Sequence, residues 1–405
     1  MIDTGNTSFV IICAALVCLM TPGLAFFYGG LVGRKNVITI MMQSFISMGV
    51  VTIIWFVIGF SLAFGPDIHG IIGSLKYAFL DCVGMEPDAV YGDTVPFLTF
   101  FSYQQMFAII TPALITGAFA DRVNFKSYLI FLVIWSLLVY VPLAHWVWGG
   151  GFLAQLGAAD FAGGIVVHAS AGLAALASVF VVGKRRDMSA SAVEPHNITY
   201  VALGTGLLWF VWFGFNAGGA MGATGLASTA FVNTDITASV AMVTWLVISW
   251  IRDKSPSFVG ALTGAVAGLA TITPAAGYIK PWGAFILGIM AGVICYFAVL
   301  LRKKLDWDDA LDVWGVHGVG GMLGAVMIGV LAVSEVNGVS GLVEGNVTQF
   351  FIQLGATAFA GAYAFAVTFV ILKVINKFTP VRVSEQEELE GLDHALHHEE
   401  AYRLE

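Results

Sequence analysis

Long apolar stretches, separated by short polar connections, follow one another through almost the whole chain. A helix needs roughly 20 apolar residues to cross the hydrocarbon core of a bilayer, and eleven stretches approach or exceed that length. Because the bilayer core offers no water to backbone N–H and C=O groups, each stretch is predicted to be a helix. The predicted spans cover residues 7–31, 37–65, 99–120, 128–148, 162–183, 198–220, 227–251, 256–275, 281–301, 311–333 and 348–376.

Two segments outside the predicted spans are both long and polar. One is the connection 66–98, and the other begins at residue 379 and is acidic from Glu385 to Glu405. Apolar residues make up 58% of the 405 residues and charged residues only 11%, a smaller polar fraction than the surface of a soluble domain needs. We therefore predict an all-α membrane domain at residues 1–378 and a cytoplasmic tail at residues 379–405.

The basic residues divide unequally between alternate connections. Of the 18 Lys and Arg residues, sixteen fall in one set of connections, at the end of the last span or in the tail, and only Lys76 and Lys280 fall in the other set. Cytoplasmic connections carry the excess of Lys and Arg, and an odd number of spans separates the termini. The pattern predicts an extracellular N-terminus and a cytoplasmic C-terminus. The net charge of −8 owes much to the tail, and no basic patch for nucleic acid is present.

A short string of residues recurs in the fifth and tenth predicted spans. The string Val-His-x-x-x-Gly-apolar begins at Val167 and again at Val316. Because five helices per half is an odd number, duplicated halves would be inverted and related by a pseudo-twofold axis, where transporter sites tend to lie. The string predicts two inverted repeats of five helices, followed by one extra C-terminal helix.

The repeated string places His168 and His317 well inside their spans. Ionisable groups at this depth are costly and usually line a pathway, although a hydrogen bond between two helices is the alternative interpretation. A neutral imidazole carries one donor and one acceptor, so two of them can bond each other and still offer a nitrogen to a passing molecule.

Aromatic residues cluster near the predicted extracellular ends of spans three to six. Tyr103 and Phe107 are four residues apart and therefore share a helix face, and Trp148 and the run 209–215 supply more rings. Rings of this kind are often core or interface residues, but a cage of them also holds small ammonium-type cations by cation–π attraction.

Carboxylates are nearly absent from the spans: Asp160 and Asp312 abut span ends, and Asp235 lies within the span 227–251. A pore for a hydrated cation would usually be lined with acidic or carbonyl rings, so this absence disfavours one. Asp160 suits a helix N-cap, a site residue, or both.

Six ordered strings along the chain resemble the signatures of the Amt/Mep/Rh ammonium transporters, in particular the bacterial and archaeal Amt type. They are Pro22-Gly23-Leu24-Ala25-Phe26-Phe27-Tyr28-Gly29-Gly30-Leu31-Val32, His145-Trp146-Val147-Trp148-Gly149-Gly150-Gly151, Asp160-Phe161-Ala162-Gly163-Gly164, Gly214-Phe215-Asn216-Ala217-Gly218, Asp312-Val313-Trp314-Gly315-Val316-His317-Gly318 and Gly391-Leu392-Asp393-His394. The resemblance covers the whole chain.

The resemblance implies roles for individual residues, and the implied substrate is ammonium or ammonia, with methylammonium as an analogue. The substrate-recruitment site would comprise Trp148, Tyr103, Phe107 and Gly219, the gate Phe107 and Phe215, the pore lining His168 and His317, and the supporting residues Asp160, Trp212 and Asp312. It further implies a homotrimer in the lipid bilayer of the inner (plasma) membrane, no cofactor or metal, and a regulatory tail that responds to a PII-type signalling protein.

Two positions in the recruitment site depart from the family pattern. Gly219 stands where a serine hydroxyl often completes the site, and Tyr103 stands where phenylalanine is common. We expect the Tyr103 hydroxyl to replace the missing serine. In the tail, His397-His398-Glu399 replaces the usual His-Gly-Glu.

The resemblance leaves three kinds of protein to distinguish. An ammonium ion that sheds its proton could pass as neutral ammonia, either with the proton following, in an electrogenic transporter, or without it, in a gas channel. A sensor of the same fold would bind ammonium with little or no flux. An intramembrane enzyme would need a nucleophile–base pair or a metal cluster at depth, and the spans carry neither pattern.

Overall fold

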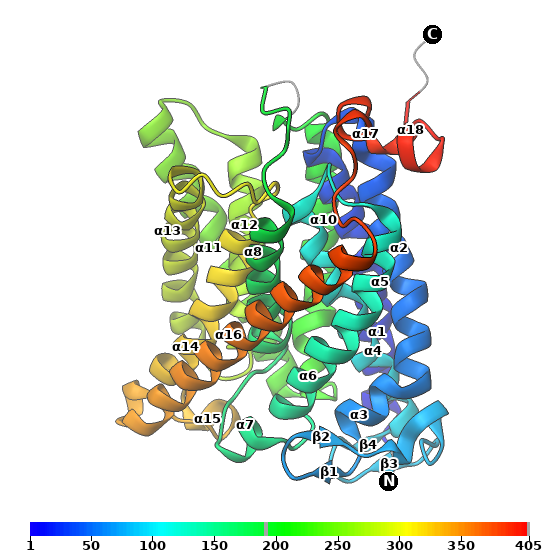
Figure 1. The fold of residues 1–405 in the computed structure, drawn as a ribbon. Helices are drawn as coiled ribbons and strands as arrows, with labels where there is room; N and C mark the ends of the chain where they lie inside the picture. Colours follow the sequence, from blue (N-terminus) through cyan, green and yellow to red (C-terminus); the bar gives the residue numbers. More distant parts are fainter. Residues whose placement is uncertain (190–192, 403–405) are drawn as a thin grey trace.

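The computed structural model describes residues 1–189 and 193–402, which form a bundle of long helices running between two opposite faces (Figure 1). The N-terminus and the two small hairpins lie at one face, which we call the N-face. The C-terminal helices lie at the other, which we call the C-face. Arg403, one of the basic residues of the predicted tail, lies outside the described residues.

Each of the eleven predicted spans coincides with a helical segment. The main helices of these segments are α1 (Thr4–Leu31), α2 (Val37–Ile54) with α3 (Phe60–Phe64), α4 (Phe97–Ile115), α5 (Phe125–Trp135) with α6 (Val141–Val147), α8 (Ser170–Val182), α10 (Ile198–Ala217), α11 (Gly225–Asp253), α12 (Phe258–Ile272), α13 (Pro281–Lys304), α14 (Val319–Leu331) and α16 (Val347–Phe378). Within the described residues, ten segments are long and apolar enough to cross a membrane, and α12 is a shorter apolar helix.

Tighter or wider helical turns extend several of these helices, and short elements connect them. The π-helical turns are η2 (Trp55–Gly59), η5 (Ser136–Tyr140), η6 (Gly164–Ala169) and η8 (Trp314–Gly318), and the 3-10 turns are η1 (Arg34–Asn36), η3 (Leu75–Leu80), η4 (Thr116–Phe119), η7 (Gly218–Ala220) and η9 (Leu342–Glu344). The connecting elements are the antiparallel hairpins β1 (Asp67–Ile68) with β2 (Ile72–Gly73) and β3 (Pro87–Asp88) with β4 (Gly92–Pro96), and the helices α7 (Phe152–Gln155) and α15 (Ser334–Asn337).

Small residues allow the helices to approach closely where packing in lipid replaces the hydrophobic effect. On α12, a Cβ atom added to Gly264 would lie 2.6 Å from the Cβ of Trp245 on α11. On α13, a Cβ added to Gly288 would lie 2.7 Å from the Cβ of Val240, also on α11. Helix α11 therefore packs against both α12 and α13 at positions where a larger residue would not fit.

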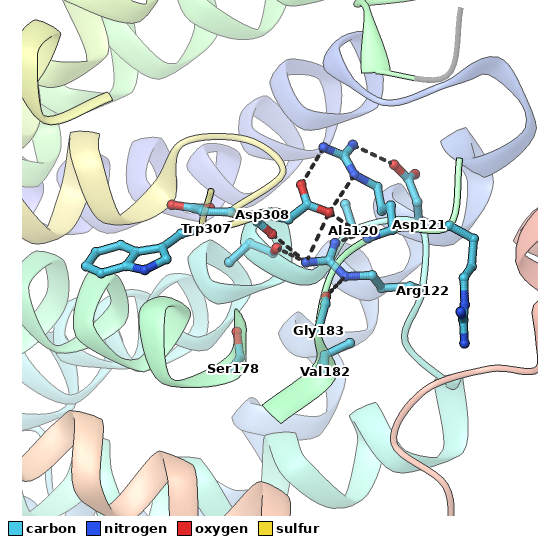
Figure 2. Close-up of polar contacts among 12 residues, drawn as sticks. Ala120, Asp121, Arg122, Ser178, Val182, Gly183, Trp307 and Asp308 are labelled. Atoms are coloured by element: carbon cyan, nitrogen blue, oxygen red, sulfur yellow. Dashed lines mark hydrogen bonds and ion pairs between the residues drawn. The ribbon is translucent and has the colours of Figure 1, made fainter. Parts of the chain in front are cut away.

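A buried arginine ties three helix ends together at the C-face (Figure 2). The Arg122 guanidinium is fully buried and donates to the carbonyls of Ala118 (3.1 Å), Ala120 (2.8 Å), Gly183 (2.9 Å) and Asp308 (2.5 Å). Burial lowers the pKa of Arg122 to about 10, so it stays charged at neutral pH. Four acceptors compensate that charge and fix the ends of η4 and α8 and the connection before η8.

The tail packs against the C-face as two short helices, α17 (Glu385–Glu390) and α18 (Leu392–His397). The Asp393 carboxylate accepts the backbone N–H groups of Ile38 at 3.0 Å and Thr39 at 2.8 Å, in the first turn of α2. A carboxylate at this end of a helix pairs free N–H groups and complements the helix dipole. The tail is therefore anchored to the bundle by a helix cap.

Candidate functional site

A cavity of about 430 Å³ opens at the N-face and brings the predicted recruitment residues together. Its walls include Tyr103, Phe107, Trp148, Phe161 and Gly219. Trp148 is half-buried, and the edge of its ring meets Phe107 with ring centroids 6.0 Å apart. The cavity thus gathers several aromatic rings, and aromatic rings attract a small cation.

Asp160 organises the backbone beneath this cavity. Its carboxylate accepts the N–H groups of four consecutive residues, 163–166, at 2.7–3.1 Å, and these residues begin the helix that carries His168. Burial raises the pKa of Asp160, and the four N–H donors oppose that increase. The Asp160 backbone carbonyl accepts the indole N–H of Trp148 at 2.8 Å. Asp160 therefore orients Trp148 and the start of the helix, as an N-cap would.

Two phenylalanine rings separate the N-face cavity from the histidines. Phe107 and Phe215 are almost fully buried, and their ring centroids lie 4.2 Å apart with planes tilted by 30°. The Phe215 ring then lies 6.1 Å from the ring of His168. The two rings therefore face one another inside the protein.

His168 and His317 meet behind the two rings. Their Nδ1 atoms are 3.3 Å apart and their rings stack at 5.2 Å between centroids, so one ring can donate to the other. Trp212 stacks on the other side of His168 at 5.4 Å and donates its indole N–H to Thr273 at 2.8 Å. The predicted hydrogen-bond distance between the two histidines is thus present.

The histidines line a small central cavity of about 10 Å³, enough for about one small molecule. Its walls are Met20, Leu24, Ile110, Leu114, Val167, His168, Leu208, Trp212 and His317. Within the described chain, the buried Nε2 atom of His168 has no hydrogen-bond partner. His317 also lines a cavity of about 420 Å³ at the C-face, so this residue connects the central cavity to the C-face cavity. Phe107 lines the N-face cavity and contacts Phe215, which lies next to His168, so the two phenylalanine rings stand between the N-face cavity and the central one.

A second aspartate, Asp309, which sequence reasoning missed, has the same spacing from His317 as Asp160 has from His168. Asp309 stands eight positions before His317, as Asp160 stands eight before His168. Its carboxylate accepts the N–H groups of Val313 at 3.1 Å and Trp314 at 2.7 Å. Burial raises the pKa of Asp309 to about 6, and Arg302 opposes the increase. The repeated spacing from aspartate to histidine was the available signal.

Asp312, the supporting residue predicted from the sequence, has a different contact. It forms an ion pair with Arg302 and lines the C-face cavity. Asp312 therefore stabilises the connection before η8, while Asp309 caps the helix that carries His317.

The two repeated glycines explain why the histidine helices approach so closely. A Cβ atom on Gly172 would lie 2.1 Å from the backbone of Gly318, directly after His317. A Cβ on Gly321 would lie 2.6 Å from the Cβ of His168. Each glycine, four residues after one histidine, thus contacts the chain at the other histidine.

We expect Gly172→Ala to reduce transport strongly, because the added methyl group must push the two histidine helices apart. The measurement is methylammonium uptake per folded protein in liposomes. Gly206→Ala is the matched control, since no atom lies within 4 Å of a Cβ added there. Equal uptake by both variants would show that the close crossing is not needed.

Tyr103 and Gly219, the two departures from the family pattern, both line the N-face cavity. The Tyr103 hydroxyl donates to the Phe215 carbonyl at 2.5 Å, so only its lone pairs remain for another donor. A Cβ on Gly219 would lie 2.9 Å from the Phe161 carbonyl oxygen, so a serine there would require Phe161 to move.

No group of three or more His, Cys, Asp or Glu side chains among residues 1–189 and 193–402 is arranged to hold a metal ion. A bundle of helices of membrane-spanning length, with a small central cavity between larger cavities at its two faces, is typical of a multi-pass membrane transport protein. The model of the Ammonium Transporter Family matches residues 8–402. The chain therefore belongs to the ammonium transporter family, whose members are transport proteins and not enzymes.

Relatives and solved structures agree with this assignment. The chain is 48% identical over 402 residues to an ammonium transporter of Bacillus subtilis, which covers 98% of each chain. It is 46% identical to ammonium transporter Amt1 of Archaeoglobus fulgidus, over 98% of this chain and 99% of that protein.

Among solved structures, Mep2 of Candida albicans matches with a TM-score of 0.89 and 36% identity, over 95% of this chain and 88% of that one. A protein described as a sensor Amt protein matches with a TM-score of 0.90 and 28% identity, over 97% and 98% of the two chains.

Proposed function

We propose that this protein carries ammonium across the membrane by recruiting NH4+ in the N-face cavity, removing its proton and passing ammonia between the histidines. The observation that carries the proposal is the unpartnered, buried Nε2 atom of His168 in a central cavity with room for about one small molecule. In this proposal Trp148, Tyr103, Phe107 and Gly219 form the recruitment site and Phe107 and Phe215 form the gate.

The apolar walls of the central cavity argue against passage of the intact ion. Moving a bare unit charge into such surroundings costs on the order of tens of kcal/mol on an idealised Born estimate. Ammonia is neutral and can exchange hydrogen bonds with the imidazole nitrogens as it passes. Deprotonation before the ring gate therefore lowers the barrier far more than any contact within the cavity could.

The proton either returns to the N-face or follows ammonia through the hydrogen-bonded histidines. The second route gives an electrogenic transporter and the first a gas channel, and we favour the electrogenic route. The 3.3 Å Nδ1–Nδ1 contact supports it, because a proton can pass between nitrogens that share a hydrogen bond.

The proposed topology is eleven crossings, formed by two inverted repeats of five and one extra helix. The reciprocal glycine contacts and the equal spacing of Asp160 and Asp309 from their histidines support the repeats. The excess of basic residues supports a cytoplasmic C-face and an extracellular N-face in the inner (plasma) membrane. We also propose a homotrimer, with a regulatory tail at residues 379–405 that responds to a PII-type protein.

A second candidate function is ammonium sensing with little flux, which the similarity to the sensor Amt protein favours. Uptake of radiolabelled methylammonium into liposomes separates the two. We expect saturable uptake that unlabelled ammonium inhibits. Ammonium binding to the purified protein without any uptake would support the sensor and contradict the transporter.

We expect Tyr103→Phe to raise the half-saturating ammonium concentration severalfold. The hydroxyl holds the Phe215 carbonyl and offers lone pairs near the cavity, and one lost hydrogen bond costs about 1 kcal/mol. The measurement is the concentration dependence of methylammonium uptake. Adding Gly219→Ser to this variant should restore affinity if Phe161 can move aside. An unchanged half-saturation in Tyr103→Phe would show that recruitment rests on the rings alone.

A further inference from the structure

A buried histidine outside the path, His145, lies close to the recruitment tryptophan. It is fully buried near the end of α6, three residues before Trp148. Its Nδ1 atom is 2.9 Å from the backbone carbonyl oxygen of Ala63, and its Nε2 atom is 2.9 Å from a carboxylate oxygen of Asp67. Both ring nitrogens therefore face oxygen atoms that accept hydrogen bonds.

This geometry determines where the protons lie. A carbonyl oxygen cannot donate, so Nδ1 must carry a proton. The contact between Nε2 and Asp67 also needs a proton, and a carboxyl group is the stronger acid of the two. The side chain of Asp67 is 32% exposed and also accepts the N–H of Gly70 at 2.9 Å, which stabilises its ionised form. Two protons on the ring and none on the carboxylate satisfy every group.

We propose that His145 is an imidazolium paired with Asp67 at neutral pH, and that this ion pair positions Trp148 for ammonium recruitment at the N-face cavity. The inference rests on the proposed function, because it assigns a positioning residue to the recruitment site. It adds that recruitment responds to the proton on His145 and not only to the rings that touch the substrate.

The turn that follows His145 connects the ion pair to Trp148. The His145 backbone carbonyl accepts the N–H groups of Gly149 at 2.9 Å and Gly151 at 3.0 Å, which stand one and three residues after Trp148. Gly149 packs so closely that a Cβ there would lie 1.9 Å from the Ala63 carbonyl oxygen and 2.7 Å from Nδ1 of His145. A rotation of the imidazole would therefore disturb the turn that carries Trp148.

The same pair holds the hairpin β1–β2 against the end of α6. Asp67 begins β1, and two further contacts join the hairpin to this region. The Trp146 indole N–H donates to the Ile71 carbonyl at 2.7 Å, and the Phe152 N–H donates to the Gly70 carbonyl at 2.9 Å. These two contacts join groups without an acidic or basic side chain, so the His145–Asp67 pair supplies the ionisable side chains of the junction.

Loss of one proton from His145 would turn an attraction into a repulsion. The neutral ring keeps the Nδ1 proton for Ala63, so the Nε2 lone pair would face the Asp67 carboxylate. Other titratable groups near Asp67 are His69 on the same hairpin and Tyr91 before β4. Burial raises the pKa of Tyr91, which keeps its phenol neutral at alkaline pH. His69 is exposed and serves as a control.

Asp67→Asn separates the charge of the pair from its geometry. An asparagine amide has the same shape and can donate to Nε2, so a neutral His145 keeps both hydrogen bonds at any pH. Without a carboxylate, nothing compensates a buried imidazolium, which should lose its charge. His69→Gln removes the neighbouring titratable group and leaves the pair intact.

The first test is ¹⁵N NMR of histidine-labelled protein at neutral pH, with the His145 signals assigned by their absence in His145→Gln. Two protonated ring nitrogens in the wild-type protein, and one in Asp67→Asn, are expected. A neutral His145 in the wild-type protein would overturn the proposal.

The second test compares methylammonium uptake at about pH 6 and about pH 9, with rates expressed per concentration of the cation. In the wild-type protein and in His69→Gln, we expect the half-saturating concentration of methylammonium to rise severalfold at the higher pH, with a smaller change in the maximal rate. In Asp67→Asn we expect the half-saturating concentration to be the same at both pH values. The proposal would be overturned if the half-saturating concentration changed with pH equally in the wild-type protein and in Asp67→Asn. It would also be overturned if this change disappeared in His69→Gln. Absence of saturable uptake in the wild type would count against the proposed function, and the NMR result would still decide the charge of His145.

Discussion

Replacing both His168 and His317 with alanine is expected to abolish selective ammonium current. The two imidazoles carry the polar side-chain atoms that face the central cavity among otherwise apolar or stacked side chains. Ammonia that must cross without a hydrogen-bonding partner loses about 2–7 kcal/mol. Since about 1.4 kcal/mol corresponds to a tenfold change in rate, the flux should fall by roughly 30-fold or more. The measurement is the current after an ammonium pulse onto protein in liposomes.

A second outcome of the same substitution would also agree with the proposal. The missing rings leave space behind the phenylalanine gate, and water in that space would let potassium share the path, so the current would persist but lose its selectivity. His69→Ala, at an exposed histidine of the N-face, is the control and should keep the wild-type current. An unchanged, ammonium-selective current in the double variant would reduce the histidine pair to a structural hydrogen bond.

Asp160→Asn should cause the largest loss of stability among substitutions near the path. The carboxylate accepts four buried N–H groups, two at each oxygen. In asparagine one of the two oxygens is replaced by an NH2 group, which cannot accept, so two of the N–H donors lose their acceptor. Each buried donor left without an acceptor costs about 1–3 kcal/mol, so the free energy of unfolding should fall by about 2 kcal/mol or more. Unfolding in increasing concentrations of SDS measures this change.

Asp312→Asn is the matched control for this measurement. Its carboxylate pairs with Arg302 near the protein surface, where such pairs contribute about 1 kcal/mol or less, and asparagine tolerates the positive φ angle of 60° at this position. Equal destabilisation by the two substitutions would show that the four N–H contacts of Asp160 contribute little. Asp160→Asn should also raise half-saturation, because the Asp160 carbonyl orients Trp148.

The positions of the spans could be predicted because membrane-length apolar stretches must become helices. The sequence could not show where the helices widen into π-turns, since such turns depend on tertiary contacts. Two of these turns, η6 and η8, contain His168 and His317. The short helix α12 was predicted at its correct place, but its 15 residues fall below the length of the other spans.

Contacts within the site were harder to predict when they joined distant parts of the chain. The stacked pair Phe107 and Phe215 followed from family motifs, and the histidine contact followed from the repeated string. The pairing of His145 with Asp67 crosses 78 positions, and no local pattern marks it. Tyr103 was expected to accept a hydrogen bond in the cavity. Helix periodicity predicts only the helix face on which a side chain lies, so the hydrogen bond from the Tyr103 hydroxyl to the Phe215 carbonyl could not be predicted.

The most direct test of ammonium transport through this path is to record current and radiolabelled methylammonium uptake side by side, on wild-type protein reconstituted in liposomes. Electrogenic transport predicts a saturable inward current after an ammonium jump, accompanied by methylammonium uptake that ammonium inhibits. Uptake without current would mean that the protein passes neutral ammonia and that the proton returns to the N-face. Ammonium binding with neither current nor uptake would contradict the account and identify the protein as a sensor.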